Sequence, residues 1–308
     1  MSVRPRLAPR NDLFPYGLAR RSKKPCDDSP PALSGQKQVT LRCPMSTATS
    51  SSSSSPTIST FSVTKGGKIA ETYACFARWD LSATVDENLD RFREENSILA
   101  PTDAWLKEMR RILRLRFLDI ERHRPLIRLA QAGMRQETWA PILLWHLCFR
   151  ELLLSDFLES WLFPRKQEGM LRVRSNEVRG YLEGLPARGL LDRDWTANTV
   201  SRMVSGLPAY AADFGLLQGK AVKEIAPFHL PDEALLYVLH DIAGDVTSAE
   251  RILEDNRWKR FLLSRAELEQ DVLRLHQHRR VTFEIAGRMT VLELPYRSAG
   301  EYAEQLVR

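Results

Sequence analysis

A short amphipathic helix is encoded past the middle of the chain, within residues 195–225, which read WTANTVSRMVSGLPAYAADFGLLQGKAVKEI. Val200, Met203 and Val204 recur with the three- and four-residue spacing that places side chains on one face of a helix. The pattern therefore predicts a helix over Thr196–Ser205 that buries this apolar face.

The residues that follow predict a break and then a hairpin. Proline inside a helix costs about 3 kcal/mol. We therefore expect Gly206 and Pro208 to interrupt the helix, and Pro208 to start a short new helical turn through Phe214. Leu216–Ile225 can then fold as a hairpin around Gly219-Lys220.

A second helix is predicted upstream, capped near Ser175, with Val178, Tyr181 and Leu182 facing inward. A connection rich in Gly and Pro at 184–189 separates it from the helix described above. Helix, connection, helix and short hairpin follow one another in a winged helix-turn-helix. We expect such a domain over residues 166–230.

The outward face of the Thr196–Ser205 helix predicts contacts with DNA. Small polar side chains allow a helix to approach a DNA groove closely. Arginine can bind guanine, and asparagine can bind adenine. Residues 165–223 contain ten basic and six acidic residues. An ordinary solvated helix in a winged fold that binds proteins remains an open alternative. The candidate DNA-binding residues here are Arg172, Arg174, Asn198, Thr199, Ser201, Arg202, Ser205 and Lys220.

Residues 61–165 show helical periodicity throughout and predict an N-terminal helical bundle. Thr102 is placed to cap one of its helices. The last helix is apolar on more than one face, so we expect it at the centre of the bundle. The expected helices span residues 65–79, 84–96 and 103–120, and a long one follows Gln136.

A basic stripe lies on the outer face of the predicted helix 103–120. Lys107, Arg110, Arg111 and Arg114 share that face and could neutralise phosphates. They could equally form a solvated face, alone or paired with the acids at 86–95 of the preceding helix. Both interpretations stay open.

The C-terminal part, 231–308, predicts helices and one more hairpin. A helix is expected at Pro231–Ala243, followed by capping boxes at Thr247/Glu250 and Ser264/Glu267. Val281 to Leu294 then alternates around a turn at Ala286-Gly287, which predicts a second winged-helix-like module. Residues 224–255 hold eight acids and one base and would repel a duplex. The overall prediction is a mainly α fold, an N-terminal helical bundle followed by winged-helix-like modules with short β-hairpins.

The net charge of +6 comes from the first residues of the chain. Residues 1–44 hold nine Lys or Arg and three acids, whereas 36 basic and 36 acidic residues follow. Residues 1–60 are rich in Pro, Arg and Ser and are expected to be disordered, and Met45 is an alternative start. The longest charge-free apolar run, 138–149, is too short to cross a membrane, so we expect a cytoplasmic protein.

No motif for catalysis, for a cofactor or for a metal is found. The sequence lacks GxxxxGK[ST], GxGxxG, HExxH, GxSxG and CxxC patterns. Cys75 and Cys148 are expected to be buried thiols, and His146 to lie in the core. His276 and His278 point apart on a helix and cannot share a metal there. We expect His123, His229 and His240 to stand alone. We also expect that the protein is not an enzyme and has no small-molecule substrate.

Several short segments follow one another in a recognisable order. They are Ser62–Gly67 with the helix that ends at Trp79, Glu95-Asn96, Leu106–Leu118, Trp195-Thr196, Asp213–Leu217 and Trp258–Ser264. Their order resembles the BrxA family of the BREX bacteriophage-exclusion systems over most of residues 61–295. The resemblance implies an all-helical DNA-binding protein with winged-helix character and without enzymatic activity. It also implies that the protein works beside a methyltransferase, an ATPase and a phosphatase-like protein.

Three functions follow from these observations. The first is double-stranded DNA binding by an accessory protein of phage defence. The second is an assembly subunit of the same system whose winged domains bind proteins. The third is a helical RNA-binding, antitermination-like factor.

Overall fold

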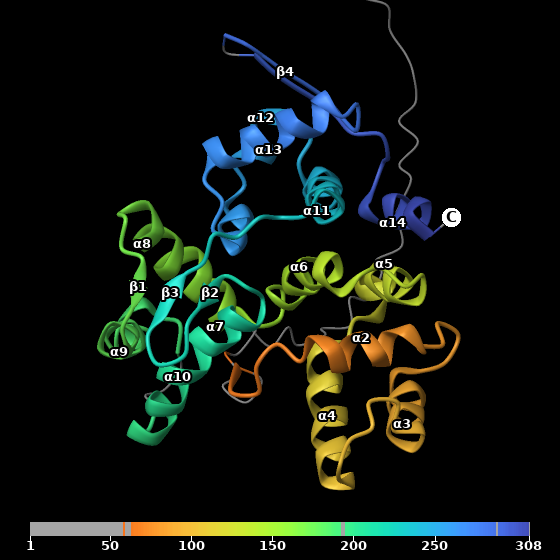
Figure 1. Ribbon diagram of the computed structural model, residues 1–308, viewed down its shortest axis with the longest axis vertical. Helices are drawn as coiled ribbons and strands as arrows, with labels where there is room; N and C mark the ends of the chain where they lie inside the picture. The colour runs from red at the N-terminus through yellow and green to blue at the C-terminus, as the bar shows by residue number, and fades with distance from the viewer. Residues whose placement is uncertain (1–57, 59–62, 192–194, 288, 308) are drawn as a thin grey trace, which may run out of the picture. The chain divides into compact units, whose positions relative to one another are not determined.

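Helices dominate the computed structural model, which describes Ile58 and residues 63–191, 195–287 and 289–307. The strands within these residues form one antiparallel sheet of three strands and one of two (Figure 1). The predicted mainly helical class with short hairpins is confirmed. Apart from Ile58, the segment predicted to be disordered, 1–60, lies outside the described residues.

The first helices begin at residues that can cap them. Thr84 and Thr102 each accept a backbone N–H from the third residue of the helix that follows. The helix predicted over 103–120 ends earlier, at Arg116, because Asp119 caps a new helix. The helices are α2 (Ile69–Ala77), α3 (Val85–Glu95), α4 (Asp103–Arg116), α5 (Ile120–Gln131) and α6 (Gln136–Leu147).

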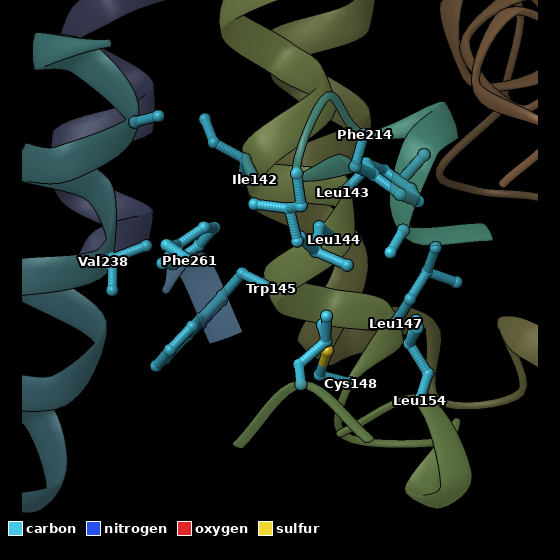
Figure 2. Close-up of a cluster of buried hydrophobic side chains, with 14 of the residues drawn as sticks. Ile142, Leu143, Leu144, Trp145, Leu147, Cys148, Leu154, Phe214, Val238 and Phe261 are labelled. Carbon is cyan, nitrogen blue, oxygen red and sulfur yellow. The ribbon is translucent and has the colours of Figure 1, made fainter. Parts of the chain in front are cut away.

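Helix α6 is buried along most of its length and lies within the apolar core, as predicted. Figure 2 shows Phe214 on one side of α6 and Val238 and Phe261 on the other. The long helix expected after Gln136 is interrupted after Leu147. The chain continues as α7 (Leu152–Asp156), the π-helical segment η1 (Phe157–Leu162) and α8 (Phe163–Gln167).

The next segment combines two helices with a three-stranded antiparallel sheet. In the sheet, β3 lies between β1 and β2, and Leu217 pairs with Ile225 across the predicted hairpin. The hairpin around Gly219-Lys220 is therefore confirmed. The elements are β1 (Arg172–Val173), α9 (Ser175–Glu183), η2 (Pro186–Arg188), α10 (Ala197–Asp213), β2 (Leu217–Gln218) and β3 (Lys223–Ile225).

The prediction that the helix stops before Pro208 is wrong. Helix α10 runs without a break from Ala197 to Asp213, and Pro208 lies inside it. The residues on both sides of the proline supply the compensation, because Leu207, Tyr210 and Ala211 are fully buried. Burying one large apolar side chain contributes about 1.5–3 kcal/mol. Two of them offset the roughly 3 kcal/mol that proline costs.

The C-terminal residues form the predicted first helix, the helix after Ser264 and the hairpin, but one predicted cap is wrong and the last helix was not predicted. Ser264 and Glu267 form the expected capping box, with the Ser264 N–H donating to Glu267 at 2.8 Å. The box predicted at Thr247/Glu250 is wrong, because Ser248 is the N-cap residue there. The elements are α11 (Asp232–Asp245), α12 (Ala249–Leu253), η3 (Asn256–Phe261), α13 (Arg265–Gln277), β4 (Thr282–Ala286), β5 (Met289–Glu293) and α14 (Ala299–Val307).

Buried side chains from the predicted segments 61–165, 166–230 and 231–308 belong to one hydrophobic cluster. The boundaries between these segments therefore stay predictions. None of the helices in the described part of the chain has the length and apolar character that a membrane span needs.

Candidate nucleic-acid interface

Helix α10 turns one face to the core and the other to solvent, as the sequence predicts. The Thr196 hydroxyl caps the helix by accepting the Thr199 N–H at 3.2 Å. On the inner face, Val200, Met203 and Val204 are buried. The predicted contact residues on the outer face are half-buried at Thr199 and exposed at Asn198, Ser201, Arg202 and Ser205.

Some basic side chains of residues 172–223 pair with acids, and others have no acidic partner among the described residues. Arg172 pairs with Glu224, at 3.0 Å between Nε and Oε1, although the Arg172 side chain is 68% exposed. Arg188, by contrast, pairs with Asp156 at 2.5 Å. Within the described residues, no acidic partner is found for five neighbouring cations, namely Arg174, Arg179, Arg202, Lys220 and Lys223.

Arg179 is a candidate contact that the sequence analysis missed. It is exposed on α9, and its Nη2 lies 3.4 Å from the Ser201 Oγ of α10. One signal in the sequence could have pointed to it, namely Gly180, a glycine inside a predicted helix directly after a basic residue.

The basic stripe on α4 is engaged by acids, the second of the two arrangements that the sequence left open. Arg110 pairs with Asp86 and Asp90, at 3.2 and 2.7 Å, and Arg114 pairs with Asp86 at 2.9 Å. Lys107 pairs with Asp103 at 2.8 Å, and Arg111 has a partner of its own. A phosphate would have to compete with these carboxylates, so any role of the stripe in DNA binding stays a prediction.

The acids of residues 224–255 are also largely paired. Several of their partners are arginines that precede, lie in or follow α13, between residues 257 and 280. Arg260 is buried and pairs with Glu159 at 2.7 Å, so it offers no charge to a ligand. The pairs are Glu224–Arg172, Asp232–Arg274, Glu233–Arg280, Asp241–Arg122, Asp245–Arg257, Glu254–Arg265 and Asp255–Arg257.

The C-terminal half of α10 is held by residues 63–67, which precede α2. The Gly67 N–H donates to the Asp213 carboxylate at 2.7 Å. Gly66 has φ +73°, and a Cβ there would lie 2.6 Å from the same carboxylate oxygen. At Gly206 the backbone of the 63–67 segment would lie 3.7 Å from an added Cβ. A Cβ at Gly67 would lie 2.9 Å from the Phe214 ring, so the close contacts with Asp213 and Phe214 explain why glycines stand at 66 and 67.

A buried ion pair fixes the same segment from the other side. The Arg116 Nε donates to the Glu151 carboxylate at 3.0 Å, and the two side chains are 1% and 3% exposed. The guanidinium also donates to the carbonyls of Gly66 and Gly67, at 2.7 and 3.2 Å, and lies over the Tyr210 ring. Arg116 therefore links α4, the 63–67 segment and α10.

Three histidines are built into buried hydrogen-bond networks, and two of them were expected to stand alone. His123 contacts His146 at 3.0 Å between the Nδ1 atoms, and the His146 Nε2 lies 2.8 Å from the Tyr237 hydroxyl. Burial lowers the pKa of His123 to about 4 and holds that of His146 well below its usual value. His240 accepts the Tyr296 N–H at 3.3 Å. The prediction for His123 and His240 is therefore wrong, and that for His146 is confirmed.

The thiols of Cys75 and Cys148 are buried and free, as predicted. Burial raises the pKa of each to about 12, which keeps both protonated and unreactive at neutral pH. Within the described residues, no group of three or more His, Cys, Asp or Glu side chains is arranged to hold a metal ion.

Comparison with known proteins identifies the family. The BrxA family model matches residues 60–240, which is more than half of the chain and includes α2 to α10 and the three-stranded sheet. The matched residues include the 63–67 segment and Asp213, which contact one another. The Trp258–Ser264 segment lies beyond the match. A search of curated proteins found no matching relative. The chain belongs to the BrxA family and is thus a component of a BREX phage-defence system.

Proposed function

We propose that this chain is a non-catalytic accessory protein that binds double-stranded DNA in the cytoplasm, beside the other proteins of its BREX system. The observation that carries the proposal is the outer face of α10. It exposes Asn198, Ser201, Arg202 and Ser205, and no acidic side chain among the described residues pairs with Arg202. Such a face can enter a major groove and contact base edges.

The arrangement around α10 supports the proposal. A helix, a strand, two further helices and a hairpin follow one another, from α8 through β1, α9 and α10 to β2 and β3. This order is consistent with a winged helix-turn-helix over 166–230, in which the second helix of the motif is the one that reads DNA. The N-terminal bundle, 61–165, would hold that helix in place through Arg116 and the 63–67 segment. We propose residues 231–308 as a second, C-terminal module.

Duplex DNA fits this face better than single-stranded nucleic acid does. Proteins that bind single strands stack bases on exposed aromatic rings. The aromatic residues described between 171 and 223 offer no such platform: Tyr181, Tyr210 and Phe214 are buried, and Trp195 is half-buried. This favours duplex DNA over the RNA-binding alternative.

One observation favours the assembly role as a second candidate. The β4–β5 hairpin exposes apolar side chains, with Ile285 52% and Met289 71% exposed. Exposed apolar surface of this kind is typical of protein contacts when it forms a contiguous patch. A chain that binds its BREX partners but not duplex DNA would support this candidate.

The test is a binding series with a fluorescent 30-base-pair duplex at rising salt. Binding through phosphates weakens steeply with salt, by a slope of about 0.9 per phosphate contact. Asn198→Ala combined with Arg202→Glu should lower the affinity for duplex by tenfold or more without changing the melting temperature. Arg251→Glu, the same charge change at an exposed position of α12, is the matched control.

Removing residues 1–60 separates the basic tail from the folded part. Our proposal expects duplex binding to survive that deletion. Binding that disappears with the tail, but is unchanged by the α10 substitutions, would contradict the role of α10. A stronger response to single-stranded RNA than to duplex would support the third function instead.

A further inference from the structure

The crossing of α9 and α10 carries an arginine whose only hydrogen-bond partner within the described residues is neutral. Arg179 of α9 donates through Nη2 to the Ser201 Oγ of α10 at 3.4 Å. No ion pair joins Arg179 to a carboxylate of the described residues. Arg188, in the same segment, is compensated by Asp156. The fold thus keeps one arginine of this segment charged and exposed while it neutralises another.

The residue after Arg179 is a glycine that the fold does not require. Gly180 lies inside α9 without a positive φ, and a Cβ added there would meet nothing within 4 Å. Glycine inside a helix lowers stability relative to alanine. Gly66 differs, because it has a positive φ and a Cβ there would lie 2.6 Å from the Asp213 carboxylate. A bare backbone at position 180 leaves room for a ligand next to the Arg179 guanidinium.

We infer that Arg179 contacts a phosphate of the DNA backbone, that Ser201 positions its guanidinium, and that Gly180 lets the backbone approach. This inference rests on the proposed function and assigns α9 a part in it. In helix-turn-helix complexes the first helix crosses the backbone while the second reads the bases. Arg179 lies on the first of the two helices here, and it donates to the Ser201 hydroxyl of the second.

The experiment measures binding of the full chain to the same labelled 30-base-pair duplex, with Arg179→Ala, Ser201→Ala and the double variant. Arg188→Ala is the control, because it removes an arginine that Asp156 already neutralises. We expect Arg179→Ala to weaken binding about threefold to tenfold and to reduce the salt slope by about 0.9, the value for one phosphate. Ser201→Ala should weaken binding less, and the double variant should match Arg179→Ala alone.

Gly180→Ala gives an independent test. Alanine should raise the melting temperature by about 2 °C, because it favours the helix. It should nevertheless weaken duplex binding at least threefold, because a methyl group would stand where the DNA backbone approaches. A purely structural glycine would show only the rise in melting temperature.

The outcomes separate this inference from the proposed function. If the unmodified chain does not bind duplex DNA, the proposed function fails and the inference fails with it. If the chain binds but Arg179→Ala behaves like Arg188→Ala, only the inference is overturned. Effects of Arg179→Ala and Ser201→Ala that add in the double variant would remove the positioning role of Ser201.

Discussion

Arg116→Met tests whether the buried ion pair holds α4, the 63–67 segment and α10 together. The substitution keeps an apolar stem of similar length and removes the guanidinium. It leaves the Glu151 carboxylate, only 3% exposed, without its cation, and it removes the donors to the carbonyls of Gly66 and Gly67. The structure around α10 would then contain a buried charge and weakened backbone hydrogen bonding.

The expected loss follows from these contacts. Removing one partner of a buried ion pair costs about 3–5 kcal/mol. A buried carbonyl that loses its donor costs at least about 1 kcal/mol. We therefore expect Arg116→Met to lower the free energy of unfolding by about 5–7 kcal/mol and the melting temperature by at least about 10 °C. Arg114→Met, which breaks an exposed pair with Asp86, should cost far less, because water screens that pair.

Urea unfolding followed by circular dichroism measures both variants. A third variant, Arg116→Met with Glu151→Met, removes the uncompensated charge and should recover part of the loss, because an apolar replacement of a buried pair is often well tolerated. Equal midpoints for Arg116→Met and Arg114→Met would refute the argument. So would a double variant less stable than the sum of its two single variants.

Two further predictions concern backbone conformation and pH. Gly66→Ala should lower the free energy of unfolding by about 2–3 kcal/mol, and Gly133→Ala by about 1 kcal/mol. Both glycines have positive φ, but only at Gly66 would an added Cβ lie 2.6 Å from a carboxylate oxygen. Equal unfolding midpoints of the two variants in urea would contradict this. Burial lowers the pKa of His123 to about 4, so its folded form binds fewer protons than the unfolded chain between pH 4 and the ordinary histidine value of about 6.5. The contribution of His123 to stability should thus be complete above pH 6.5 and fall as the pH drops toward 4. The free energy of unfolding should fall by up to about 1.4 kcal/mol per pH unit for each such histidine. Urea titrations at several pH values should show that His123→Leu flattens this dependence. An unchanged slope would show that His123 titrates normally.

Much of the secondary structure could be predicted because its signals are local. The caps at Thr102 and Ser264 and the hairpin around Gly219-Lys220 depend on residues a few positions apart. The apolar face of α10 follows from helical spacing, so the outward position of Asn198 and Arg202 was predictable as well. What these exposed side chains bind stays a proposal.

The errors arose where a local signal was outweighed by distant packing. Pro208 ends a helix in isolation, but the burial of Leu207 and Tyr210 carries α10 past it. His123 is 23 residues from His146 in the sequence, and nothing near either predicts that their rings meet. The basic stripe of α4 was predictable as a stripe, but its pairing with Asp86 depends on how α3 packs beside it.

Local signals were enough to predict most helices and hairpins, since capping, turn geometry and apolar periodicity act within one or two turns of the chain. Long-range packing instead brings Gly67 to Asp213, 146 residues away, and buries Arg116 against Glu151. It also pairs Arg188 with Asp156, whereas Arg179 contacts the neutral Ser201 and has no acidic partner among the described residues. The physical reason is that burial and charge pairing depend on which elements come to lie together. Residues of the same type therefore acquire different roles only once the chain has packed.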